Sequence, residues 1–93
     1  MIVGIVKVKI YIPFAHSLKE KRTIVKSLCS KIKNNFNVSI SEVENQDVHQ
    51  TIGLGIAIVS NNSKHIDSII DKIINYIEAN TEGEIIEINR EIV

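Results

Sequence analysis

The sequence has few of the residues that mark a specialised class of protein. It contains no Trp, two Phe and two Tyr, so aromatic rings cannot build the core. Ile, with 20 copies in 93 residues, must do so, and its branched side chain favours strands. A single Cys excludes an intrachain disulfide, and no run of Pro, Gly or Ser forms a linker. These absences indicate one globular domain with an aliphatic core.

The chain also lacks an excess of either charge, with 11 Lys and Arg against 11 Asp and Glu. Its length suits a single domain over residues 1–93. The apolar segment at residues 2–12 is interrupted by Lys7 and Lys9 and ends at Pro13, which is too short and too charged for a signal peptide or a membrane span. We therefore expect a cytoplasmic protein with no membrane partner.

Hydrophobic periodicity predicts four strands and two helices. Apolar and other residues alternate over residues 2–12, 37–44, 51–60 and 85–93, and Ile86 and Ile88 are expected to face the core in the last strand. One amphipathic helix begins at Ser17, which precedes Glu20 by the three residues of a capping box. A second follows the SNNS turn and carries Ile at helical spacing.

The order βαββαβ predicts an α+β, ferredoxin-like sandwich, in which a four-stranded antiparallel sheet of order 4-1-3-2 has both helices on one face. The other sheet face is then uncovered, and its small and apolar residues are candidates for a homodimer or protein interface. Gly53 and Gly55 would let another backbone approach closely. The candidate interface residues are Val3, Ile5, Tyr11, Gly53, Gly55, Ala57, Val59 and Ile85.

The first helix carries a strong charge of one sign. Between residues 13 and 33, six Lys or Arg residues accompany only Glu20, which gives a formal charge of +5 (six minus one). Several of them share an arc beside the apolar stripe, where they could bind nucleic-acid phosphates or another anion. A solvated helix face would show the same pattern. The candidate binding residues are His16, Lys19, Arg22, Lys26 and Lys33.

Other clusters support weaker hypotheses. The loop before the helix could hold an anion, but Ser17 as a helix cap is the simpler interpretation. Acylphosphatase, a small hydrolase of this fold, carries a glycine-rich loop ending in Phe-Arg, which PFAHSLKEKR does not contain. Glu42 and Glu44 should share a strand face near His49, where a solvated hairpin is expected rather than a metal site. Cys29 falls on the buried helix stripe. We expect no catalytic residues, metal or cofactor.

Several segments together resemble the YlxP-like family of small bacterial proteins. They are HSLKEKR (16–22), FNVSISEV (36–43), QDVHQ (46–50), LGIAIVSN (54–61) and EIIEINREI (84–92), and they cover nearly the whole chain in order. The resemblance implies a ferredoxin-like domain of unknown biochemical activity. It also implies genes found among those for transcription-elongation, translation-initiation and ribosome-maturation factors, which suggests work on RNA or the ribosome.

The leading hypothesis is a non-catalytic cytoplasmic binding module that contacts structured RNA or a ribosomal particle through the basic first helix. The alternative is a protein-interaction or homo-oligomeric module that uses the uncovered sheet face and binds no nucleic acid. An RNA-recognition motif needs aromatic rings on the central strands of that face, and only Tyr11 is available. The third hypothesis is a small phosphate-ester or acyl-phosphate hydrolase.

Overall fold

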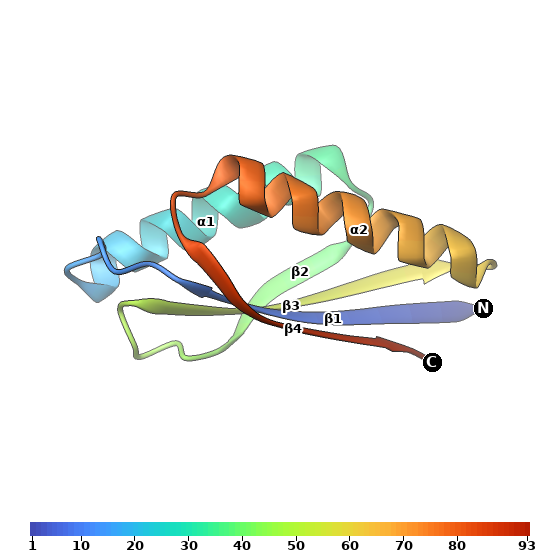
Figure 1. The fold of residues 1–93 in the computed structure, drawn as a ribbon, viewed down its shortest axis with the longest axis horizontal. Coiled ribbons are helices and arrows are strands. Elements are labelled where there is room, and N and C mark those ends of the chain that lie inside the picture. The colour runs from blue at the N-terminus through green and yellow to red at the C-terminus, as the bar shows by residue number, and fades with distance from the viewer.

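The chain forms four strands and two helices in the order βαββαβ (Figure 1). In this computed structural model, which covers residues 1–93, the antiparallel sheet has the order β2-β3-β1-β4. This is the predicted order 4-1-3-2, so the α+β, ferredoxin-like architecture is confirmed. The elements are β1 (Ile2–Tyr11), α1 (Leu18–Asn35), β2 (Ser39–Glu44), β3 (Thr51–Ser60), α2 (Ser63–Asn80) and β4 (Glu84–Ile92).

Both helices cover the same face of the sheet, and no helix covers the opposite, open face (Figure 1). Sixteen hydrophobic residues are buried, and eleven of them are Ile, as the scarcity of aromatic residues predicts. The central strands β1 and β3 supply alternate residues to this core, while α2 supplies Ile66, Ile70, Ile73 and Ile77. Neither helix has the combination of length and apolar composition needed to cross a bilayer.

Side-chain caps fix where each helix begins. The Ser17 hydroxyl accepts a hydrogen bond from the Glu20 backbone N–H at 3.1 Å, and the Glu20 carboxylate accepts one from the His16 N–H at 3.0 Å. This reciprocal pair has the spacing of the predicted capping box, with the carboxylate reaching the N–H of His16, one residue before the cap. At α2, the Asn62 side-chain oxygen accepts from the Lys64 N–H at 2.9 Å. A carboxylate of the chain therefore already occupies the first turn of α1, where the sequence analysis considered a site for an anion.

A bulge in each edge strand reverses the expected orientation of several side chains. In β4, Ile85 pairs with Ile10 and Glu87 pairs with Lys9, so Ile86 is the extra residue. The prediction that Ile85 lies on the open face is wrong, because this extra residue turns Ile85 toward the core, against which it packs. Ile86, which was expected inside, is 53% exposed.

The second bulge lies in β2, where Glu42 pairs with Leu54 and Glu44 pairs with Gly53. Val43 is the extra residue, so Glu44 turns to the open face, while Glu42 remains on the helix-covered face with Ile40. The expectation that these two carboxylates share a face is therefore wrong. An alternating pattern cannot reveal this change, because a bulge inserts one residue into a period of two.

The β2 bulge also covers Gly53 and Gly55, which the sequence analysis expected to be accessible on the open face. A Cβ atom on Gly53 would lie 2.7 Å from the Glu44 Cβ and 2.8 Å from the Glu44 carbonyl oxygen. A Cβ on Gly55 would lie 3.0 Å from a methyl of Val43. Gly53 is buried, so its assignment to a partner interface is wrong: the close approach that Gly53 allows is made by the chain's own backbone.

This difference predicts unequal effects of two matched substitutions. Gly53→Ala should lower the free energy of unfolding by about 1–3 kcal/mol, because the obstructing atoms include backbone that cannot rotate away. Gly55→Ala should cost less than half as much, because it meets only methyls of the exposed Val43. Urea unfolding of both variants measures the two values, and an equal loss would contradict the role given to the bulge.

Candidate nucleic-acid interface

Four of the predicted binding residues form one continuous surface on α1. Lys19, Arg22, Lys26 and Lys33 lie within an arc of about 60° at 100° per residue, and all four side chains are exposed. His16 is also exposed and lies in the loop just before the helix. We call these five residues the cationic face. The structure thus brings together the whole set that the sequence predicted.

The cationic face differs from the other charged surfaces because none of its side chains forms an ion pair. Four of the eleven Lys and Arg residues are paired with carboxylates elsewhere: Lys7, Lys9, Lys21 and Arg90. Seven remain unpaired, and five of these are on α1, counting Lys31. A neutral chain therefore concentrates most of its unpaired positive charge on one helix.

Lys21 has a structural role that the sequence analysis missed, because it was counted only in the formal charge of the first helix. Its side chain is 0% exposed, and its ammonium group lies 2.7 Å from a Glu42 carboxylate oxygen. The ammonium also donates to the Asn45 carbonyl and, at 2.7 Å, to the Val48 carbonyl. Lys21 thus fastens α1 to β2 and to the β2–β3 loop. The surface charge of α1 is +4 (five minus one for Glu20) rather than +5.

A detectable signal for this burial was present in the sequence. Position 21 lies between Leu28 and Ile32 on the helical wheel, inside the apolar arc of α1. A lysine there must either extend to solvent or meet a buried acceptor. Its acceptor, Glu42, follows Ile40 by two residues on the core-facing side of β2, but it was not identified because both Glu42 and Glu44 were assigned to a solvated hairpin.

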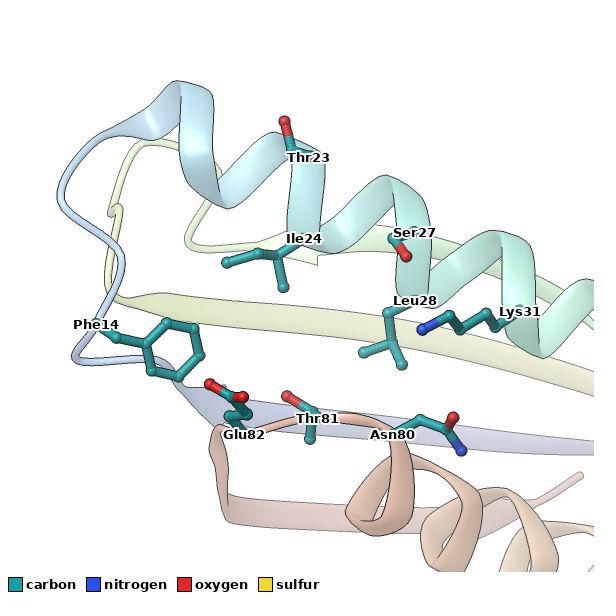
Figure 2. A pocket seen from close by; sticks show the side chains of 9 residues that line it. All are labelled: Phe14, Thr23, Ile24, Ser27, Leu28, Lys31, Asn80, Thr81 and Glu82. Atoms are coloured by element: carbon teal, nitrogen blue, oxygen red, sulfur yellow. The ribbon is translucent and has the colours of Figure 1, made fainter.

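Lys31 lies on the opposite flank of α1 from the cationic face. It borders a cavity of about 320 Å³ between α1 and the segment that joins α2 to β4 (Figure 2). Ile24 and Leu28 form its apolar wall, and the exposed Phe14 ring closes one end (Figure 2). No sequence pattern predicted this cavity, because its two walls are distant in the chain.

The open face carries a row of charges across three strands. Glu44 of β2 pairs with Lys7 and, at 3.7 Å, with Lys9 of β1, while Lys9 lies 3.4 Å from Glu87 of β4. The hydrogen bond from Lys7 lowers the pKa of Glu44 below its ordinary value, and the same contact raises the pKa of Lys7. These lysines are therefore already neutralised, unlike those on α1.

The remaining predicted interface residues fall into two separate groups on the open face. Val3, Ile5, Ala57 and Val59 adjoin one another at one end, because Ile5 pairs with Ala57 and Val3 pairs with Val59. Tyr11, 39% exposed, lies at the other end of β1. The row of charges and the covered glycines separate the two groups, so they do not form one continuous apolar patch.

Groups with catalytic or metal-binding chemistry are dispersed. No cluster of three or more His, Cys, Asp or Glu residues could hold a metal ion. Cys29 is half-buried on the flank of α1, and this burial raises the pKa of its thiol above the ordinary value. It therefore has the environment of a packed thiol rather than of an activated nucleophile.

Comparison with known proteins agrees with the resemblance seen in the sequence. The family model described as "Protein of unknown function (DUF503)" matches residues 3–90. The chain is also 35% identical over 82 residues to "Uncharacterized protein YlxP" of Bacillus subtilis (strain 168), an alignment that covers 88% of this chain and 89% of the relative. The expectation of a YlxP-like family is confirmed.

The role of Lys21 can be tested by removing one or both partners of its ion pair. Lys21→Met should cost about 3–5 kcal/mol of unfolding free energy, because Glu42, only 15% exposed, loses its counter-ion. Lys21→Met combined with Glu42→Leu should recover part of that loss. Urea unfolding of the single and double variants gives the comparison; a double variant less stable than Lys21→Met would contradict the pairing.

Proposed function

The chain belongs to the DUF503 family, and we propose that this member is a non-catalytic binding module that contacts the phosphate backbone of structured RNA, free or in a ribosomal particle, through its cationic face. The observation that carries this proposal is that no ion pair forms on four cations of α1, namely Lys19, Arg22, Lys26 and Lys33. The cations on the strands of the sheet, by contrast, are paired with carboxylates.

The shape of the cationic face favours an extended polyanion over a small anion. Lys19 and Lys33 are 14 positions apart, so the four cations extend over about 21 Å at 1.5 Å per residue. At the first turn, the Glu20 carboxylate already accepts the hydrogen bond of the His16 backbone N–H, which leaves that donor unavailable to a small anion. A phosphate backbone places charges along such a length, and each neutralised phosphate releases counter-ions.

The open face offers little for reading bases. Tyr11 is its only aromatic residue, and the centre of the face is covered by Val43, Glu44 and the charged row. Base stacking on a sheet requires aromatic rings on the central strands. We therefore propose contact with RNA shape and backbone rather than recognition of sequence. The gene neighbours implied by the family resemblance favour RNA over other polyanions.

A protein-interaction module without nucleic-acid binding is the alternative. Its support is the apolar end of the open face, where Val59 is 63% exposed beside Ala57 and Ile5. A partner there would leave the free charge of α1 without a role beyond solvation. For that reason the RNA-binding function is preferred.

The proposal predicts a strong dependence of RNA binding on salt. With about four phosphate contacts, affinity for ribosomal RNA should fall about 100-fold between about 50 and about 200 mM salt. Lys19→Glu/Lys26→Glu should abolish binding or, where binding is still measurable, lower the salt slope by about 2. Fluorescence anisotropy with labelled ribosomal RNA fragments, and sedimentation with ribosomal subunits, provide the measurements.

A matched control uses the two unpaired lysines of α2. Lys64→Glu/Lys72→Glu changes the net charge by the same amount but alters the other helix, and both side chains are exposed. It should retain most of the affinity. If both double variants lose the same affinity, binding follows net charge and the assignment to the cationic face fails. If the parent protein binds no RNA at low salt, the proposed function fails.

A further inference from the structure

We infer that β4 is a self-association edge, and that a second copy of this chain pairs with it in an antiparallel, two-fold arrangement centred on Ile88. The resulting dimer would have one continuous eight-stranded sheet. This inference concerns assembly and does not depend on the proposed function. It also places self-association on a different surface from the open face that the sequence suggested.

The composition of β4 favours association. It is the outermost strand, none of its nine residues is buried, and three of its isoleucines are exposed: Ile86 at 53%, Ile88 at 39% and Ile92 at 41%. It has no Pro or Lys, the residues that commonly block edge pairing. Both edges carry a bulge and an inward-pointing charge, Glu42 in β2 and Arg90 in β4, so they differ chiefly in length: β2 has six residues and β4 has nine.

The hydrogen bonds to β1 determine which β4 backbone groups are free. Val93 and Val3 exchange both backbone hydrogen bonds, at 2.8 and 2.9 Å. In an antiparallel ladder the groups that point toward the neighbour alternate along the strand. Ile88, Arg90 and Ile92 therefore direct their N–H and C=O groups away from β1, toward the unoccupied side. These three residues can form a second ladder without disturbing the first.

Charge then selects the register. In an antiparallel pair, directly opposed residues point to the same face of the sheet. If the helices of both copies are to lie on one side, the two-fold axis must pass through a residue that opposes its own copy, and not between two residues. If the axis passes through Glu87, Arg90 or Glu91, that charged residue lies opposite the same residue of the second copy. Centring on Asn89 opposes Glu87 to Glu91. All four registers bring like charges together, which is destabilising.

The register centred on Ile88 avoids this repulsion. It places Ile88 against Ile88 of the second copy on the helix-covered face, and the Glu87 carboxylate opposite the Asn89 amide, which can donate to it. Of the five centres between Glu87 and Glu91, it is therefore the one without opposed like charges. The exposed isoleucines would also be withdrawn from water at this seam.

Analytical ultracentrifugation of the purified, nuclease-treated protein tests the inference. The parent chain should sediment as a dimer at micromolar concentrations. Ile88→Lys should be monomeric, because it opposes two lysines at the centre of the seam. Val59→Lys, an equally disruptive change on the open face, should remain dimeric. A monomeric parent, or a dimer that survives Ile88→Lys, would overturn the proposal.

Cross-linking gives a second test that does not rely on a destabilised variant. In the Cys29→Ser background, Ile88→Cys should form an intermolecular disulfide on oxidation, because opposed Cα atoms in a hydrogen-bonded pair lie about 5.5 Å apart. Val59→Cys should not. Cross-linking through Val59 but not Ile88 would place the interface on the open face instead. Both tests are made without RNA, so their outcome is independent of RNA binding.

Discussion

The buried ammonium group of Lys21 is the contact on which the orientation of α1 depends. It is held by the Glu42 carboxylate and by the Asn45 and Val48 carbonyls, and these acceptors lie at the end of β2 and in the following loop. A charge removed from water must keep its partners, so α1 cannot roll without a large loss of stability. Because Lys21 points to the sheet, Lys19 and Lys26 on the far side of the helix must point to solvent. The surface that we propose for RNA therefore results from an internal ion pair.

Periodicity in the sequence was sufficient to predict the fold. The alternating strands, the capping box at Ser17 and the Ile spacing of α2 all correspond to elements of the structure, and the strand order follows from their sequence. These signals are local, and each depends on a repeat that continues through an element. The cationic face was predictable for the same reason, because helical geometry alone places its members together.

The features that were not predictable depend on single residues that interrupt a repeat. The bulges at Val43 and Ile86 each shift the alternation by one position, which moves Glu44 to the open face and Ile85 to the helix-covered face. Their placement depends on pairing with neighbouring strands, and no short pattern encodes it. Gly53 was misjudged for a related reason: a missing side chain indicates that something comes close, but does not say whether it belongs to the same chain.

The proposed dimer and the cationic face are compatible because they occupy opposite sides of the fold. The order β2-β3-β1-β4 puts β4 at one edge, whereas α1 lies over the β2 side, where Lys21 meets Glu42. Pairing through β4 would leave both copies of α1 unobstructed at the ends of one sheet. With strands about 4.8 Å apart, the two β2 strands would be about 34 Å from each other. Two backbone-binding faces at that separation can engage one folded RNA together, and binding by the first raises the effective concentration of the second. Four cations on one copy give only a low affinity for RNA at physiological salt. Two copies acting together would raise the overall affinity without a larger basic surface on each.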